Sequence, residues 1–237
     1  MSDENTAWKV FRHWPIERLE DNLWRVQGTL PGIPLYRVMT VIKRADGTLV
    51  IHGGIALEED AMKEIEAWGT PAVLVVPNQA HRLDAARFKA RYPNLRVYCP
   101  RPAKKKVEEI VPVDATYESF PNGDDLRVEP LDGLKGAEGV FVVQSGARTS
   151  LIFNDAVFNM AHRKGLPGFI FKYLTQSSGG PRVSRLVKLF FVKQKGAFRA
   201  HLERLSELPN LVRVIVAHHE TITENPSAAL KTAASTL

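Results

Sequence analysis

The stretch that decides the fold is VVPNQAHRLDAARF, residues 75–88. It continues an apolar run at 73–76, which is typical of a buried strand covered on both faces. A Pro-Asn loop follows, and the spacing predicts a helix over 83–92 that ends before Pro93. His81 lies in the junction between the strand and the helix. A buried strand that passes through a short loop into a helix indicates an α/β domain with parallel strands.

The residues around this stretch extend the same pattern. Strands are expected at 23–29, 35–43 and 49–52, and Asp46-Gly47 predicts a tight hairpin between the last two. A helix is expected over 58–68 and another strand at 96–99. The order βαβαβ favours a parallel sheet with helices on its faces.

The rhythm changes after residue 126. Short strands are expected at 127–131, 140–144 and 149–153, and the Gly-containing turns between them favour antiparallel pairing. Helices are expected over 182–192 and 197–208, then a strand at 212–216. A last helix is expected over 225–236, with Asn225 as N-cap and Pro226 in its first turn. With no repeat and no clear linker, the sequence predicts a single domain, 1–237.

Composition excludes several classes of protein. The chain has 237 residues, 44% hydrophobic and 24% charged, which is ordinary for a globular protein. Its single cysteine, Cys99, excludes an internal disulfide, and we expect a cytoplasmic protein in which Cys99 is a small buried hydrophobe. The N-terminal residues are acidic and polar, so no secretory signal is expected. No run reaches the roughly 18–20 apolar residues of a membrane span.

Positive charge is concentrated in one segment. The net charge is +6, yet residues 156–202 hold nine Lys or Arg and no Asp or Glu, so the rest of the chain sums to −3. Aromatic residues alternate with these bases, which would suit an anion-binding or membrane-surface patch. The interpretation we favour is a basic helical insertion whose apolar faces pack on the sheet and whose lysines are solvated. RPAKKK at 101–106 is expected to be solvated too, and no nucleic-acid motif is present.

Polar side chains follow several of the expected strands. His52 ends one strand, His81 follows another, Asp155 follows a third, and His218-His219 follow the last. The carboxyl ends of strands in such sheets form a common rim where ligands bind. Imidazole and carboxylate are good ligands for zinc, iron or manganese. The other histidines, His162 and His201, are expected at the surface of helices.

Five segments together resemble the metallo-β-lactamase fold, and more narrowly its DUF4336-type members. They are TLVIHGG (48–54), VVPNQAHRLDAARFKARYPNLRVYCP (75–100), LDGLKGAEGVFVV (131–143), LIFNDAVFN (151–159) and VIVAHHE (214–220). The resemblance implies an α/β fold, a four-layer αββα sandwich with mixed sheets and a two-metal site along one edge. A doubly wound sheet is the alternative, but the short strands clustered at 126–153 argue against it.

The departures from the family pattern point to a depleted metal site. One histidine, His81, stands where the family has three, and Leu134-Lys135 stand where a Gly-His pair is expected. Asp155 and His218 match ligand positions, while His52 replaces an aspartate. The resemblance therefore implies one zinc or iron ion held by His81, Asp155 and His218, with His52 as a further candidate, or no metal at all.

Two functions follow from this set. The first is a metal-dependent hydrolase of an ester, thioester or phosphate, with Asp84 or His219 as the catalytic proton carrier. The second is a non-catalytic protein that binds an anionic small molecule, or a partner through the basic segment 156–202. Structural roles also stay open: His81 as a packing residue, Asp155 as the cap of its turn, and Asp84 as an acid in the first turn of a helix.

Overall fold

The computed structural model describes residues 6–136 and 138–237. Its contacts divide the chain into two compact units, Met1–Arg127 and Val128–Leu237. The boundary falls inside the strand β8 (Leu126–Pro130), so no Gly- or Pro-rich linker marks it in the sequence. The single domain expected from the sequence stays a prediction, and each unit is described by itself below.

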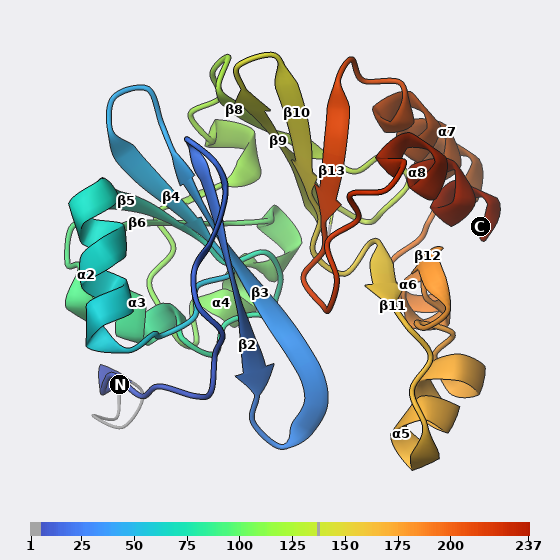
Figure 1. The fold of residues 1–237 in the computed structure, drawn as a ribbon, viewed down its shortest axis with the longest axis horizontal. Helices are drawn as coiled ribbons and strands as arrows, with labels where there is room; N and C mark the ends of the chain where they lie inside the picture. The colour runs from blue at the N-terminus through green and yellow to red at the C-terminus, as the bar shows by residue number, and fades with distance from the viewer. Residues whose placement is uncertain (1–5, 137) are drawn as a thin grey trace. The chain divides into compact units, whose positions relative to one another are not determined.

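The first unit is built on a seven-stranded sheet in the order β1-β2-β3-β4-β5-β6-β7 (Figure 1). Pairing is antiparallel from β1 to β4 and parallel from β4 to β7. The Asp46-Gly47 hairpin is confirmed, since Gly47 has a φ of 81° and Asp46 Oδ1 accepts a hydrogen bond from the Thr48 N–H. The strands are β1 (Glu17–Glu20), β2 (Leu23–Leu30), β3 (Ile33–Lys43), β4 (Thr48–His52), β5 (Thr70–Val75), β6 (Arg96–Cys99) and β7 (Ala115–Thr116).

Helices complete the core of this unit. Helix α2 (Glu59–Trp68) buries Met62 and Ile65, and Trp68 stacks on Trp24 with ring centroids 3.9 Å apart. Helix α3 (Ala85–Arg91) contributes Phe88 to the same cluster. Short helical turns follow at η1 (Arg101–Ala103), α4 (Lys104–Val107) and η2 (Tyr117–Ser119). Cys99 is fully buried as expected, and burial raises the pKa of its thiol to about 12.

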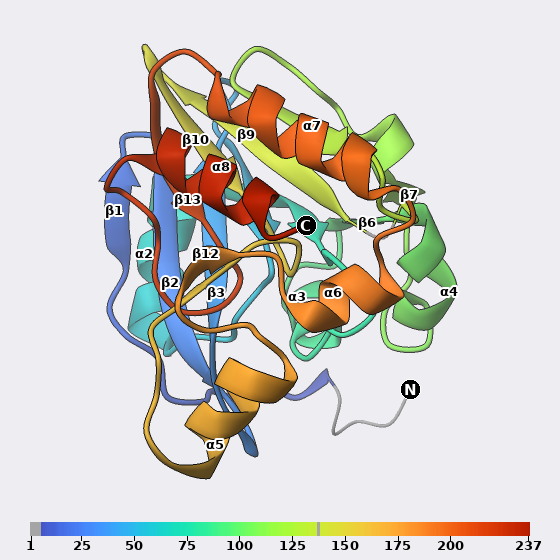
Figure 2. The same ribbon diagram turned by 90° about the vertical axis from the view of Figure 1, so that its right-hand side faces the viewer.

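The second unit has a four-stranded mixed sheet in the order β13-β10-β9-β8. Strands β9 (Gly139–Ser145) and β10 (Arg148–Ile152) form an antiparallel hairpin, and β13 (Leu211–Ile215) pairs parallel with β10. Helices α7 (Lys195–Ser206) and α8 (Pro226–Ser235) lie side by side against this sheet (Figure 2). The N-cap prediction is confirmed, because the Asn225 side chain accepts a hydrogen bond from the Ala228 N–H.

The basic segment is less helical than the sequence predicts. It contains β11 (Phe158–Met160), α5 (Gly165–Phe169), a π-helical turn η3 (Ile170–Leu174), β12 (Gly180–Arg182) and α6 (Arg185–Phe190). The helix expected over 182–192 begins only at Arg185. Residues 180–182 instead form β12, which pairs with β11 and starts at two glycines with positive φ, Gly179 and Gly180. Ser184 then caps α6.

The surface expectation is confirmed for His162 and wrong for His201. His162 is exposed. His201 lies on the buried side of α7, three residues after Phe198, with 4% of its surface exposed. Its Nδ1 is 2.9 Å from a carboxylate oxygen of Asp132, which fixes the ring. None of the helices among residues 6–136 and 138–237 is long and apolar enough to cross a membrane.

Candidate metal centre

Asp155 and His218 are brought together by the pairing of β10 with β13. The parallel register sets Ile152 beside Ile215. If the same register continues for three residues beyond this pair, Asp155 lies beside His218. The N–H of Phe153 still donates to the carbonyl of Ile215 at 2.8 Å, so the pairing extends beyond the strand end.

A bulge sets this register. Thr149 pairs with Leu211, but the next residue, Ser150, pairs with Arg213, so Val212 is an extra residue in β13. Such bulges re-aim the side chains that follow them. Without the extra residue, the position beside Asp155 would be occupied by Ala217 instead of His218.

The two side chains meet in a partly buried position. His218 Nε2 is 3.1 Å from Asp155 Oδ1, and the side chains are 9% and 19% exposed. Phe158 lies against the His218 ring in a stacked arrangement, with centroids 5.8 Å apart. An imidazole nitrogen and a carboxylate oxygen at this separation fit a shared ion, since two ligands on a tetrahedral zinc stand about 3.3 Å apart.

Glu138 directly precedes β9, the strand that lies next to β10 in the same sheet. In the β9–β10 hairpin, Ile152 pairs with Phe141. Three residues further along this antiparallel register, Asp155 lies opposite Glu138. The Glu138 carboxyl accepts hydrogen bonds from the N–H groups of Asp155 and Ala156, at 3.0 and 2.8 Å. It thus fixes the backbone that presents the Asp155 side chain. Glu138 is not among the site residues expected from the sequence, although the register of the hairpin around Gly146 indicates it.

Glu138 is a buried acid with a raised pKa. Only 5% of the residue is exposed, and burial together with the nearby Asp155 raises its pKa to about 8. The carboxyl therefore carries a proton over much of the neutral range. This protonation keeps two carboxylates from being charged side by side.

His219 lies next to the pair in an uncommon backbone conformation. Its φ is 68°, a region in which histidine is found more often than most residues. The backbone beside it is held to β11, because the Asn159 side chain donates to the carbonyl of Glu220 at 3.0 Å. Burial, then the charges of Arg163 and His218, lower the pKa of His219 to about 4. The ring is therefore neutral near pH 7 and a weaker base than an ordinary histidine.

In the first unit, His52 and His81 follow the neighbouring parallel strands β4 and β5. His52 is 2% exposed, and its pKa is lowered to about 3 by burial and then by the nearby His81. His81 is half-buried in the loop after β5. The Asn78 side chain accepts hydrogen bonds from the N–H groups of Ala80 and His81, which gives this loop its turn. Both histidines thus lie at the carboxyl ends of neighbouring strands in the first unit.

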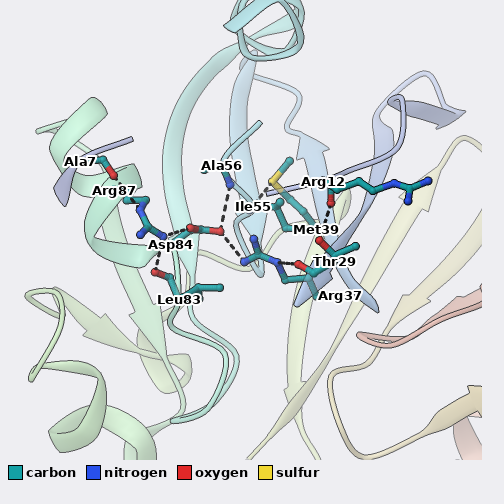
Figure 3. Close-up of polar contacts among 10 residues, drawn as sticks. All are labelled: Ala7, Arg12, Thr29, Arg37, Met39, Ile55, Ala56, Leu83, Asp84 and Arg87. Carbon is teal, nitrogen blue, oxygen red and sulfur yellow. Dashed lines mark hydrogen bonds and ion pairs between the residues drawn. The ribbon is translucent and has the colours of Figure 1, made fainter. Parts of the chain in front are cut away.

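Asp84 belongs to a buried ionic cluster (Figure 3). Its two carboxylate oxygens contact the guanidinium groups of Arg37 and Arg87, and its side chain has no exposed surface. One oxygen also accepts a hydrogen bond from the Ala56 N–H at 3.2 Å. Asp84 occupies the N-cap position of α3, but its side chain makes no capping hydrogen bond. These contacts tie β3, α3 and the loop after β4 together, so the geometry is that of a structural carboxylate.

The structure does not provide a family-type ligand at residues 134–135. Leu134 is 8% exposed and packs in the core of the second unit, where it forms a bridge with Val192. The Lys135 N–H donates to the carbonyl of Phe191. Among the residues that the structure describes, Leu134 is therefore a packing residue and Lys135 is held through its backbone.

Solved structures of metallo-β-lactamases share this fold. A crystal structure of the DIM-1 metallo-β-lactamase exposed to ceftazidime aligns with a TM-score of 0.64 at 15% identity, over 96% of this chain and 99% of that one. The metallo-β-lactamase from Pontibacter korlensis aligns with a TM-score of 0.58 at 12% identity, over 94% and 99%. No protein-family model and no curated protein matches the sequence.

These similarities confirm the predicted fold class. The chain has an α/β fold of metallo-β-lactamase type with mixed sheets. At 12–15% identity they establish the fold alone. The narrower resemblance to DUF4336-type proteins stays a prediction.

Replacing Glu138 tests whether it fixes the Asp155 loop. Glu138→Ala leaves two backbone donors without their acceptor, so we expect the free energy of unfolding to fall by about 2–4 kcal/mol. Glu138→Gln keeps one carbonyl acceptor and should lose about half as much. Urea unfolding of the three proteins measures this difference. Equal stability of wild type and Glu138→Ala would show that the contacts are dispensable.

Replacing Asp84 tests its structural assignment. Asp84→Asn leaves Arg37 and Arg87 buried beside a neutral side chain, and we expect a loss of about 3–5 kcal/mol in unfolding free energy. Asp124→Asn, at an exposed position of the same unit, is the matched control and should change stability by less than about 0.5 kcal/mol. Thermal and urea unfolding provide the comparison. A stable Asp84→Asn protein that has lost only activity would instead assign Asp84 to catalysis.

The lowered pKa of His52 predicts a specific pH dependence. Below its ordinary value of 6.5 the unfolded chain binds a proton at His52, whereas the folded chain binds it only near pH 3. Stability should therefore fall as pH drops through this window, by at most about 1.4 kcal/mol per pH unit from this group. Urea unfolding at about pH 7 and about pH 5 should show a smaller loss for His52→Gln than for wild type. The exposed-site variant His162→Gln should behave as wild type, and identical losses in all three would refute the assignment.

Proposed function

We propose that this protein is a metal-dependent hydrolase that holds one ion through Asp155, His218 and His81. The observation that carries the proposal is the placement of Asp155 and His218 side by side at the carboxyl ends of β10 and β13, with 3.1 Å between their ligand atoms. The metallo-β-lactamase type of fold supports it. We expect an ester, thioester or phosphate as substrate, in a cytoplasmic setting.

The donor set fits zinc or ferrous iron. Two imidazoles and one carboxylate are a common set for these ions and leave a coordination position open. When bound, such an ion lowers the pKa of a coordinated water and polarises the substrate oxygen. His81 enters the proposal on the sequence pattern of the loop after β5, and His52 beside it is a further candidate ligand.

The chain's own residues would position and protonate the reacting groups. Phe158 holds the His218 ring, and Glu138 holds the backbone of Asp155. His219 is the proton carrier we favour, because its neutral ring can accept a proton near pH 7. Its lowered pKa, about 4, makes that transfer less efficient than with an ordinary histidine. Asp84 is the second candidate carrier from the sequence, and its two arginine contacts make it the less suitable one.

The alternative is a non-catalytic protein on the same fold that binds an anionic small molecule. The packing of Leu134 where the family pattern has a ligand favours this function. A protein that has lost part of its ligand set can keep the fold and a pocket without the chemistry. The experiment below separates the two.

Metal binding is the direct test. Full-length protein without a histidine tag, loaded with Zn²⁺ or Fe²⁺, should retain close to one ion per chain by elemental analysis. Asp155→Ala, His218→Ala and His81→Ala should each lower the affinity by about 100-fold or more, since each removes a ligand. Hydrolysis of chromogenic esters, thioesters and phosphomonoesters should stop on chelation and return with the metal.

The control variant is His162→Ala, which removes an exposed histidine and should bind metal as wild type does. Less than about a tenth of an equivalent of metal in wild type would end the proposal, given the affinities of ordinary zinc sites. Tight metal binding without hydrolysis would favour the non-catalytic alternative. Loss of binding in His218→Ala but not in His81→Ala would remove His81 from the ligand set.

A further inference from the structure

The exposed apolar side chains of this protein are concentrated in one segment. Of nine large hydrophobic residues with exposed side chains in the described chain, seven lie between residues 166 and 190. The favoured sequence interpretation, in which the apolar faces of the basic segment pack on the sheet, holds for Val183 and Val187 but does not account for these exposed side chains. We call this surface the basic apolar face, and its apolar members are Leu166, Phe169, Tyr173, Leu174, Leu186, Leu189 and Phe190.

The first half of the face is formed by α5 and the π-helical turn. Leu166, Phe169 and Tyr173 follow helical spacing and lie on one side. Leu166 is 73% exposed. The rings of Phe169 and Tyr173 contact each other at 5.0 Å, and the Lys172 ammonium lies over the Tyr173 ring. These side chains contact one another and solvent, so the core does not explain them.

The second half is one side of α6. Val187 points into the core of the second unit, whereas Leu189 and Phe190 are 64% and 62% exposed. The helix itself is firmly attached: the Ser184 side chain caps it, and the Lys188 ammonium donates to the carbonyl of Thr236 at 2.9 Å. A well-anchored helix therefore presents an apolar side to solvent.

The two halves are joined. The N–H of Arg185 donates to the carbonyl of Thr175 at 2.8 Å, which links the start of α6 to the end of the π-helical turn. The N–H of Gly179, just before β12, donates to the carbonyl of Met160, which ties the segment between the π-helical turn and α6 to β11. Within the second unit, α5 lies beyond the β11–β12 ribbon, away from α7 and α8 (Figures 1 and 2).

The charge around the face is of one sign. Residues 156–202 contain no acid, and exposed bases accompany the apolar side chains: Lys164, Lys172, Arg185, Lys193 and Lys195. A symmetric contact between two copies would set these bases against each other. Apolar side chains that penetrate the headgroup region, flanked by bases that contact anionic headgroups, are the combination used by proteins that bind membrane surfaces.

We propose that the basic apolar face docks on the surface of an anionic lipid bilayer. Leu166, Phe169, Leu189 and Phe190 enter the interfacial layer, and the bases contact the headgroups. A concentration of exposed apolar side chains of this kind marks an interaction site. The docking depends on neither the metal nor the hydrolase activity.

Vesicle co-sedimentation of the full chain tests the proposal. Wild type should sediment with phosphatidylcholine vesicles that contain about 30 mol% phosphatidylserine, much less with phosphatidylcholine alone, and less again in about 0.5 M NaCl. Leu189→Ser/Phe190→Ser should lower the partition coefficient by about 10-fold or more, because two apolar side chains no longer enter the interfacial layer of the bilayer. Lys172→Glu/Arg185→Glu should lower it by about 100-fold or more.

Matched control variants test whether vesicle binding depends on this face or only on exposed apolar residues and net charge anywhere in the protein. Ile33→Ser/Leu83→Ser removes two exposed apolar residues of the first unit, and Lys63→Glu/Lys105→Glu makes the same change in net charge there. Both should bind vesicles as wild type does. Circular dichroism and unfolding midpoints should match wild type in all four variants, because every changed side chain is at the surface.

Three results would overturn the proposal. One is the absence of sedimentation with anionic vesicles, or equal sedimentation with neutral ones. Another is a dimer, measured by light scattering, that Leu189→Ser/Phe190→Ser dissociates, which would assign the face to a second copy. The third is binding to a polyglutamate peptide without binding to vesicles, which would assign it to an acidic protein.

Discussion

The parallel pairing of β10 with β13 is the constraint on which the candidate metal centre depends. Asp155 and His218 are 63 residues apart in the sequence, so no local contact brings them together. The register makes them neighbours, and the extra residue Val212 sets that register. A slip of one residue in a parallel pair turns every later side chain to the other face, so the bulge is part of the site.

The first unit uses the same kind of strand end differently. There the polar residues after β4 and β5 include His52 and His81, but the nearby carboxylate, Asp84, is taken up by Arg37 and Arg87. A buried ionic cluster of this kind holds a strand, a helix and a loop in one arrangement. Both oxygens of the Asp84 carboxylate are engaged in it.

Much of this was predictable from local sequence. The strands β2–β6, β8–β10 and β13, the Asp46-Gly47 hairpin and the Asn225 cap follow from patterns within a few residues, and the structure confirms them. The pairing of Asp155 with His218 came from the resemblance, since no local pattern links residues so distant. Glu138 was missed because a lone acid before an apolar strand looks like a turn residue until the hairpin register is applied. His201 was misplaced because the helix face that it shares with Phe198 is buried.

By itself, the sequence determined the order of most strands and helices outside the basic segment, the concentration of positive charge in residues 156–202, and the residue types available as ligands. These depend on interactions between near neighbours or on composition, which need no tertiary contact. Only the tertiary structure decided which side chains meet and which stay in solvent. Asp155 meets His218 and Glu138 through strand register, Asp84 is enclosed by two arginines, and the apolar side of α6 is left uncovered. Burial and long-range pairing depend on how elements pack, and an amphipathic pattern has the same sequence whether or not a partner covers it.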